Sequence, residues 1–268
     1  MLELIQITND PAFARRCDDL GGFRIFVDLE RLGKAERQAG RNTFISVHTM
    51  EDIAPVKAVL RRTPLMVRVN PLHEGTRAEV EAVIGEGADT VMLPIFRTAA
   101  EVAEFAGIVA GRLPIVTLLE TREALESLSD WASTPGIQEI YVGLNDLHLS
   151  LGCRFMFEPL ANGMVEQVAN VAKARGRRFG FGGVARLDEG QLHGRRVLGE
   201  HLRLGSGAVV LSRTFHRPGE GDSFEDEVGK LRDAETELRA RSPSQVKEDA
   251  VETAALIERI AASMPPAR

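Results

Sequence analysis

The chain alternates short, continuous apolar runs with longer segments in which apolar residues recur at helical spacing. Continuous apolar runs are typical of parallel strands that helices cover on both faces, and helices repeat their apolar residues every three or four positions. The runs predict eight strands, at residues 2–7, 24–30, 65–70, 90–94, 114–120, 139–144, 178–184 and 208–212. Eight strands alternating with helices are the count of a (β/α)8 barrel. The pattern therefore predicts a TIM barrel.

After the eighth predicted strand the pattern changes to two charged amphipathic helices, at residues 222–241 and 243–264. One of them completes the ring of helices around the barrel, so the other is additional. Their apolar stripe consists of Leu231, Leu238, Val246, Ala250, Ala254, Ile257 and Ile260. Such a stripe packs either against the chain's own barrel or against a second subunit. We divide the chain into a barrel core at 1–221 and C-terminal helices at 222–268.

Composition narrows the class of protein. A chain of 268 residues with 44% hydrophobic residues can bury the core of one barrel. The net charge of −6 argues against general binding to nucleic acid or to an anionic membrane. Two cysteines, Cys17 and Cys153, are too few for a disulfide scaffold. Because no signal segment and no apolar run of about 18 residues is present, we expect a cytoplasmic protein without a membrane span.

Two carboxylates, Glu120 and Asp146, stand where predicted strands end. The carboxyl ends of the strands form the active-site face of an α/β barrel. Oxygen ligands suit Mg²⁺ or Mn²⁺, with positions left for water and substrate. The alternative is that both acids begin the following helices, as cap or first-turn residues. We favour a divalent metal site for the pair.

The second and third predicted strands also end in charged residues. Asp28 and Glu30 fall on the same side of a strand, because strand side chains alternate. Arg68, at the end of the third strand, can bind a substrate carboxylate through two parallel hydrogen bonds. The alternative is an ion pair with Glu30 or Glu120, and both functions are compatible. In the seventh strand, the glycines at 180, 182 and 183 indicate close backbone approach rather than a phosphate loop.

Five short segments, taken in order, resemble the HpcH/HpaI aldolase and citrate lyase beta-subunit family. They are VDLE at 27–30, VRVNP at 67–71, GADTVMLP at 87–94, LET at 119–121 and GLNDL at 143–147. The resemblance covers most of the chain, from about Leu2 to about Ser212. It implies a (β/α)8 barrel whose last helix is often exchanged between subunits. It also implies cleavage or formation of a carbon–carbon bond next to a 2-oxo acid or an acyl thioester, usually with a divalent cation.

The resemblance also assigns roles to residues. Glu120 and Asp146 are similar to the metal ligands, and Arg68 to the residue that binds the substrate carboxylate. The backbone amides near Asn145 and Asp146 are expected to hold the other carboxylate oxygen. We further expect Asp28 to contact the substrate.

The residue types fit such a reaction. Cleavage of a 4-hydroxy-2-oxo acid leaves the enolate of pyruvate, and a divalent ion stabilises the charge that develops on oxygen. Arg68 adds a fixed positive charge and positions the carboxylate. No lysine stands at the end of a predicted strand, which disfavours a Schiff-base mechanism.

One position departs from the family pattern. Relatives have a histidine or an aspartate after the second-strand acid segment, and this chain has Arg31. The general base is therefore open between His48, His148 and a water molecule held by the metal, and Glu30 is a further candidate catalytic residue. The charged loop at 30–41 is either a solvated surface or a contact for an anionic group of the substrate. Its candidate contacts are Arg31, Lys34, Arg37 and Arg41.

The sequence thus predicts a metal-dependent lyase or aldolase that acts on a 2-oxo acid together with an aldehyde or acyl partner. A citrate-lyase-like acyl-CoA thioester lyase is the first alternative. A barrel that binds a carboxylate without turnover is the second. We expect a homo-oligomer built from dimers, such as a hexamer, whose C-terminal helices belong to the barrel domain or are exchanged between subunits.

Overall fold

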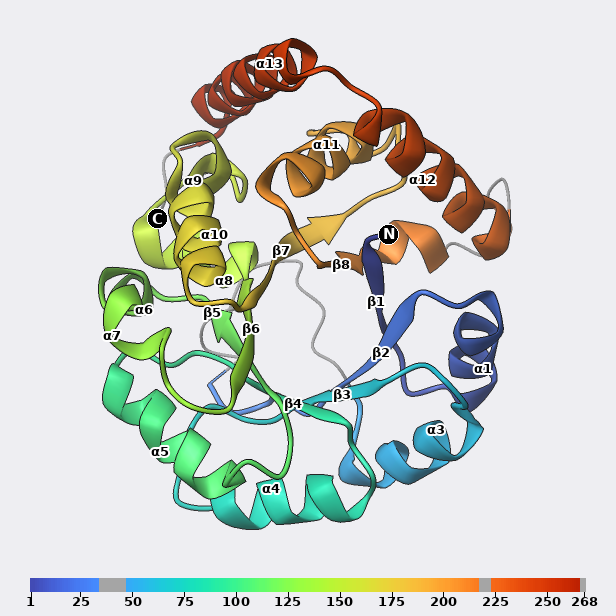
Figure 1. The fold of residues 1–268 in the computed structure, drawn as a ribbon, viewed down its shortest axis with the longest axis vertical. Helices are drawn as coiled ribbons and strands as arrows, with labels where there is room; N and C mark the ends of the chain where they lie inside the picture. The colour runs from blue at the N-terminus through green and yellow to red at the C-terminus, as the bar shows by residue number, and fades with distance from the viewer. Residues whose placement is uncertain (34–46, 217–222, 266–268) are drawn as a thin grey trace. The chain divides into compact units, whose positions relative to one another are not determined.

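The computed structural model describes residues 1–33, 47–216 and 223–265. Its eight strands are hydrogen-bonded in sequence order as a closed parallel barrel, which confirms the predicted (β/α)8 architecture (Figure 1). The strands are β1 Glu3–Ile7, β2 Phe23–Asp28, β3 Leu65–Arg68, β4 Thr90–Leu93, β5 Ile115–Leu119, β6 Ile137–Val142, β7 Arg178–Val184 and β8 Ala208–Leu211.

By its internal contacts the chain forms two compact units. We call residues 5–140 the N-terminal unit, and residues 1–4 with 141–268 the C-terminal unit.

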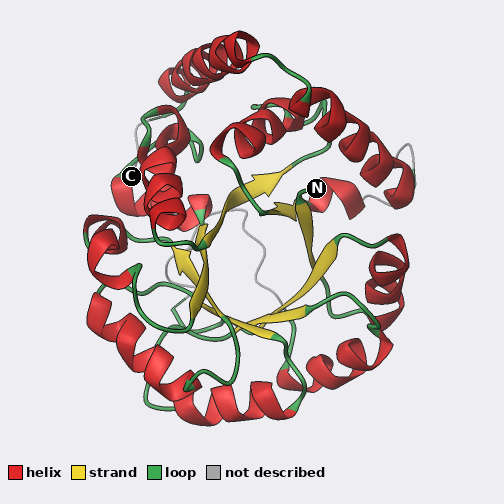
Figure 2. Ribbon diagram, in the orientation of Figure 1, coloured by secondary structure: helices red, strands yellow, loops and turns green. Residues whose placement is uncertain are grey.

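In the N-terminal unit, the strands β2 to β5 pair in parallel. Ile25 lies opposite Leu65, Asp28 opposite Arg68, and Val67 opposite Val91. The helices of this unit are α1 Pro11–Leu20, α3 Ile53–Val59, α4 Thr76–Gly85, α5 Ala99–Val109, α6 Arg122–Glu126 and α7 Leu128–Trp131, with a 3-10 turn, η1, at Met50–Asp52. Figure 2 shows the helices outside the strands, so they cover the outer face of the sheet, while the inner face is turned to the interior of the closed barrel.

Local signals set where these helices begin. The Asp10 side chain accepts a hydrogen bond from the Ala12 amide at 2.9 Å, and Pro11 takes the first position of α1. Thr98 and Glu101 form a reciprocal capping box at the start of α5. The only tryptophan, Trp131, is fully buried, donates to the Ala124 carbonyl at 2.8 Å and packs edge-on against Phe96. These contacts fix α6 and α7 against the loop that follows β4.

In the C-terminal unit, the β7–β8 ladder is irregular between Gly180 and Gly183. The hydroxyl of Tyr141 bridges this gap, because it donates to the Gly182 carbonyl at 2.7 Å and accepts from the Val210 amide at 3.0 Å. A Cβ on Gly180 would lie 2.5 Å from the Tyr141 ring. The Ala208 carbonyl would also lie 2.8 Å from that Cβ, so Gly180 allows the close backbone approach that the sequence predicts as well as contact with the Tyr141 ring.

The C-terminal unit also carries the additional helices. Its elements are α8 Leu144–Leu151, α9 Glu158–Ala161, α10 Met164–Ala174, α11 Gly194–Leu204, α12 Phe224–Arg239 and α13 Pro243–Ser263, with a 3-10 turn, η2, at Arg213–His216. Ser223 and Ser242 cap α12 and α13 through capping boxes. Helix α11 contacts both of them, and α13 also contacts α9. No helix in the described part of the chain is long and apolar enough to cross a bilayer.

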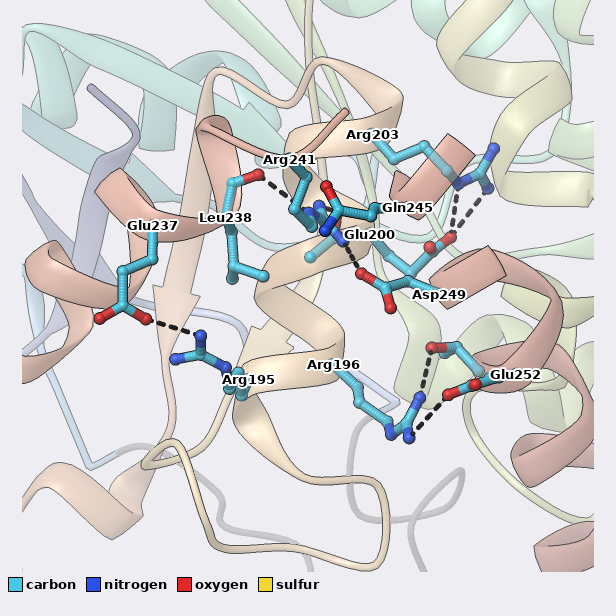
Figure 3. Close-up of polar contacts among 12 residues, drawn as sticks. Arg195, Arg196, Glu200, Arg203, Glu237, Leu238, Arg241, Gln245, Asp249 and Glu252 are labelled. Atoms are coloured by element: carbon cyan, nitrogen blue, oxygen red, sulfur yellow. Dashed lines mark hydrogen bonds and ion pairs between the residues drawn. The ribbon is translucent and has the colours of Figure 1, made fainter. Parts of the chain in front are cut away.

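Arginines connect α11 to these two helices (Figure 3). Arg241, in the turn between α12 and α13, donates to the carbonyls of Leu238 at 2.9 Å and Gly199 at 3.1 Å, and to Asp249 at 2.6 Å. Two ion pairs are more exposed, Arg195 with Glu237 at 2.7 Å and Arg196 with Glu252 at 3.3 Å. Exposed pairs contribute little to stability, so Arg241 is the main polar connection.

Helix α13 lies on its own chain with a narrow buried stripe. Thr253, Ile257 and Ala261 are buried at intervals of four residues. Other apolar members of the predicted stripe, Val246, Ala250, Ala254 and Ile260, remain only half-buried. Packing on the chain's own barrel therefore accounts for part of the stripe, and contact with a second subunit stays a prediction.

Candidate active site

Arg68 and Asp28 form the centre of a charged cluster in the N-terminal unit. They are the last residues of β3 and β2 and lie opposite each other in the sheet. Arg68 donates from Nε to Asp28 Oδ1 and from Nη2 to Asp28 Oδ2, both at 2.8 Å. Its Nη1 lies 3.1 Å from Glu30 Oε2. The side chains are 12% (Arg68), 5% (Asp28) and 1% (Glu30) exposed, so these are charge contacts shielded from water.

The strand boundary at this point differs from the prediction. Strand β2 ends at Asp28, two residues earlier than expected, and Glu30 lies beyond it. The Glu30 amide donates to Asp28 Oδ1 at 3.2 Å, which turns the chain locally. Both acids still reach the same guanidinium, by this turn rather than by strand alternation. Of the alternatives for Arg68, the ion pair with Glu30 is confirmed, and the closer pairing with Asp28 is an addition.

The electrostatics of the cluster favour the charged form of Arg68. Burial alone would lower the pKa of Arg68, but the charges of Asp28, Glu30 and Glu120 and the hydrogen bonds from Asp28 raise it above its ordinary value. The guanidinium carbon also lies 5.5 Å from the centre of the Phe26 ring, a cation–π contact. Arg68 is therefore a permanent and rigidly held positive charge.

Glu120 gives this cluster an excess of carboxylates. It follows β5 directly, is 4% exposed, and its charge acts on Arg68. Three carboxylates thus act on one guanidinium in a place shielded from water, and carboxylate oxygens are the ligands that a divalent cation such as Mg²⁺ prefers. In the described ranges, no group of three or more His, Cys, Asp or Glu side chains is arranged to bind a metal. A cation here would need water or substrate to complete its coordination, as Mg²⁺ commonly does.

Asn145 and Asp146 lie in the C-terminal unit, at the start of α8. Strand β6 ends at Val142, and Gly143 precedes the helix, so Asp146 is a first-turn acid rather than a strand-end residue. This is the first-turn helix position that the alternative to a metal ligand predicted for Asp146. The Leu147 amide is the first to bond back along the helix, to the Gly143 carbonyl at 3.0 Å. The amides of Asn145 and Asp146 precede it, at the end of a helix that favours anions.

His48 lies against the end of β2. Its Nδ1 accepts a hydrogen bond from the Asp28 amide at 3.1 Å, and the side chain is buried. Arg31 donates from Nη2 to the His48 carbonyl at 2.9 Å. His148 differs, because its Nδ1 lies 2.9 Å from the Leu144 carbonyl of its own helix α8. Of the two candidate bases, His48 therefore contacts the Arg68 cluster directly, through the Asp28 amide.

Asn70 is a further polar residue of this region, for which the sequence suggests no role. Its side-chain oxygen accepts from the amides of Arg31 at 2.9 Å and Leu32 at 3.0 Å. Its side-chain nitrogen donates to Glu79 at 2.7 Å. The signal in the sequence was its place two residues after the end of β3. Asn70 thus fixes the start of the charged loop, whose Lys34, Arg37 and Arg41 lie outside the described residues.

Comparisons with known proteins identify the family to which the chain belongs. Residues 8–177 match the sequence profile of the family described as HpcH/HpaI aldolase/citrate lyase. A (3S)-malyl-CoA thioesterase of Cereibacter sphaeroides is 32% identical over 97 residues, which span 36% of this chain and 34% of that protein. The matched segment is thus about a third of the relative's length.

Solved structures share the fold. An HpcH/HpaI aldolase from Desulfitobacterium hafniense DCB-2 has a TM-score of 0.59 at 16% identity, covering 90% of this chain and 94% of that one. A citrate lyase beta subunit from M. tuberculosis, complexed with oxaloacetate and magnesium, has a TM-score of 0.57 at 20% identity, covering 87% and 96%. At these identities the likeness shows the fold alone. Because the profile matches more than half of its length, the chain belongs to the HpcH/HpaI aldolase/citrate lyase family.

Proposed function

We propose that this protein is a divalent-metal-dependent carbon–carbon lyase that acts on a 2-oxo acid. The observation that carries the proposal is the buried cluster of Arg68 with Asp28, Glu30 and Glu120. Such a cluster combines a fixed guanidinium, which suits a substrate carboxylate, with surplus carboxylates, which suit a cation. Membership of a family of aldolases and lyases supports the same reaction class.

Arg68 would bind the carboxylate of the substrate. Its two hydrogen bonds to Asp28 use two of the five N–H donors of the guanidinium. Donors therefore remain for Glu30 and for an incoming carboxylate. The two hydrogen bonds to Asp28 fix the plane of the guanidinium before the substrate arrives. Binding therefore costs less conformational entropy. In this role Asp28 orients Arg68 rather than touching the substrate.

Glu120 and Asp146 would hold the cation, with Mg²⁺ or Mn²⁺ the best match to two carboxylate ligands. The magnesium in the complex of the M. tuberculosis citrate lyase beta subunit supports a divalent metal for this chain. When bound, such an ion supplies Lewis-acid stabilisation of the charge that develops on the 2-oxo oxygen. The amides of Asn145 and Asp146 would donate to the second oxygen of the carboxylate, aided by the helix dipole.

A second candidate is a reaction on an acyl-CoA thioester such as malyl-CoA. The relationship to the (3S)-malyl-CoA thioesterase favours it, although the match covers only 34% of that protein. Both candidates use a substrate carboxylate and develop negative charge on an oxygen, of an enolate in the lyase and of a tetrahedral intermediate in thioester hydrolysis, so the same cluster would serve either. They differ in the group beyond the reacting carbon.

The test is a binding and turnover experiment with the whole chain. Oxaloacetate is titrated into the protein by calorimetry, with and without Mg²⁺, and the cleavage of 4-hydroxy-2-oxo acids and of malyl-CoA is assayed in parallel. The proposal expects Mg²⁺-dependent binding and cleavage of at least one 4-hydroxy-2-oxo acid. Turnover of malyl-CoA alone would select the second candidate. Metal-independent binding with no turnover of either substrate would leave a carboxylate-binding barrel and refute the lyase.

A further inference from the structure

His48 is held at the end of β2 from two sides. The Asp28 amide donates to His48 Nδ1 at 3.1 Å, and Arg31 donates to the carbonyls of His48 at 2.9 Å and of Val47 at 3.4 Å. The His48 side chain is buried, with 6% of the residue exposed. A histidine that returns from a long loop and is fixed by both its ring and its backbone is part of the site's framework.

The hydrogen bond from Asp28 determines which nitrogen of the ring carries the proton. A backbone amide can only donate, so Nδ1 must accept. In the neutral ring, the proton then resides on Nε2. The lone pair of Nδ1 is occupied by the amide, and Nε2 has none to offer. In this arrangement His48 has no nitrogen with which to take a proton from a substrate.

The position of this bond in the sheet explains what it does. Amides along a strand point alternately to its two neighbours. On one edge of β2, the Leu29 amide donates to the Arg68 carbonyl at 2.9 Å. On the other edge, the Phe26 carbonyl accepts from the Thr8 amide at 3.1 Å, and His48 then provides the acceptor for Asp28. The imidazole thus accepts the hydrogen bond from the Asp28 amide that a backbone carbonyl would accept if the β-ladder continued for one more residue.

The residue fixed in this way is the one that holds Arg68. Asp28 uses both carboxylate oxygens on the guanidinium, each at 2.8 Å, and Oδ1 also accepts from the Glu30 amide at 3.2 Å. A shift of the Asp28 backbone therefore moves the guanidinium and Glu30 together. Among the charged residues of the described ranges, Asp28 contacts the His48 ring through its amide, Arg31 contacts the His48 carbonyl, and Asp52 accepts from the next amide, Thr49, at 2.7 Å.

We propose that His48 is a positioning residue, which acts as a fixed hydrogen-bond acceptor and orients Arg68 through Asp28, and is not the general base. Arg31 is its support, because it ties the His48 backbone to the end of β2. The inference rests on the proposed function in one respect, namely that Arg68 binds the carboxylate of the 2-oxo acid. It leaves the proton transfer of the reaction to another group.

Two isosteric substitutions separate these roles. In His48→Asn the side-chain oxygen can take the place of Nδ1, whereas in His48→Gln the amide reaches the place of Nε2 and the acceptor is lost. We expect His48→Asn to bind oxaloacetate with Mg²⁺ within about threefold of the wild type, and His48→Gln to bind roughly 10- to 100-fold more weakly, as for other supporting residues of a site. The pH profile of turnover keeps its shape in both variants. His48→Ala should behave as His48→Gln.

Three results would overturn the inference. If His48 were the general base, both substitutions would lower kcat by roughly 10²- to 10⁴-fold and remove the acid limb of the pH profile. If His48 only capped the end of β2, all variants would have lower thermal stability but wild-type affinity for oxaloacetate. The third is a crystal structure of His48→Gln in which both 2.8 Å contacts between Arg68 and Asp28 are intact.

The crystal structures also separate this inference from the proposed function. We expect the contacts between Arg68 and Asp28 to survive in His48→Asn and to lengthen or break in His48→Gln. If they do so while the wild-type protein binds no oxaloacetate in the presence of Mg²⁺, the positioning of Arg68 stands and the proposed function fails. Whether these contacts survive can be seen in crystal structures of the variants without a bound substrate.

Discussion

The guanidinium of Arg68 and the carboxylate of Asp28 meet edge to edge, with two hydrogen bonds of 2.8 Å, at the ends of neighbouring strands. A pair of this geometry fixes the plane of the guanidinium as well as its position. A lysine in its place would keep the charge but not the plane. The effect of Arg68→Lys on substrate binding therefore measures how strongly the site depends on the plane of the guanidinium.

We expect Arg68→Lys to weaken the binding of oxaloacetate although the charge remains, because the flat two-pronged contact is lost. Hydrogen bonds to charged groups contribute roughly 1.5–3 kcal/mol, so the loss should be about tenfold or more. Calorimetric titration measures it, and Arg112→Lys, at an exposed ion pair with Glu81, is the matched control. Wild-type affinity in Arg68→Lys would remove the residue from the substrate site.

Glu120→Gln and Asp146→Asn should each abolish metal-dependent turnover, since an amide is a weaker ligand for Mg²⁺ or Mn²⁺ than a carboxylate. Circular dichroism should show that the barrel still folds. Glu123→Gln, an exposed first-turn acid of α6, serves as the control and should retain activity. Near-wild-type turnover of either variant at saturating metal would refute its assignment as a ligand.

Tyr141→Phe removes only the hydroxyl that bridges β7 and β8. The Gly182 carbonyl and the Val210 amide both lose a partner. We expect the free energy of unfolding to fall by about 1–3 kcal/mol, measured by urea denaturation. Ser263→Ala, which removes an exposed hydroxyl of α13, should change it by less than about 0.5 kcal/mol. Equal effects of both substitutions would mean that the bridge contributes nothing specific.

His201 gives the protein a defined sensitivity to acid. It is fully buried in α11, stacks on Phe181 with ring centres 3.8 Å apart, and burial lowers its pKa from 6.5 to about 3. The unfolded chain therefore binds a proton below pH 6.5 that the folded chain rejects, so stability falls as the pH drops from 6.5 toward 3.

The size of this effect is testable by substitution. His201 should account for a loss on the order of 4 kcal/mol across that range. In His201→Asn, the slope of the free energy of unfolding against pH, measured by urea denaturation, should decrease by an amount that corresponds to close to one proton. His193→Asn, at an exposed position before α11, should leave the slope unchanged. A wild-type slope in His201→Asn would show that other groups carry the acid sensitivity.

Assembly remains the prediction with the clearest single measurement. Half-buried apolar residues along α13 and the family's exchanged C-terminal helix lead us to expect a dimer or a ring of dimers. Light scattering at micromolar concentration should give a multiple of the chain mass of 29.3 kDa. A stable mass near that of one chain would contradict both the oligomer and the exchanged helix.

The sequence predicted the barrel well because buried strands leave a strong signal. For β7 the apolar run and the observed strand coincide, at residues 178–184. The predicted run of β2 extends two residues beyond the strand, because Leu29 is apolar and its amide still donates to the Arg68 carbonyl of β3. Strand β6 also ends two residues before the predicted run, at Val142, because Gly143 caps α8 and Asp146 falls in the first turn of that helix.

The contacts of the site were harder to predict than its residues. The sequence offers Glu30 and Glu120 as partners of Arg68 as readily as Asp28, and only the register of β2 against β3 makes Asp28 the nearest. A register cannot be read from apolar runs whose ends are uncertain by two residues. The Tyr141 hydroxyl shows the same limit, because its partners lie 41 and 69 positions away along the chain.

The chain holds one tryptophan and one tyrosine, and they fall in different units. Trp131 is buried in the N-terminal unit, and Tyr141 belongs to the C-terminal unit. Fluorescence excited at the red edge, where tyrosine does not absorb, therefore reports on the first unit alone. Tryptophan also absorbs where tyrosine does, so the tyrosine signal must be resolved by second-derivative absorbance, and it then reports on the second unit. The natural chromophores thus allow the two halves of this barrel to be watched separately as they fold, without any introduced label.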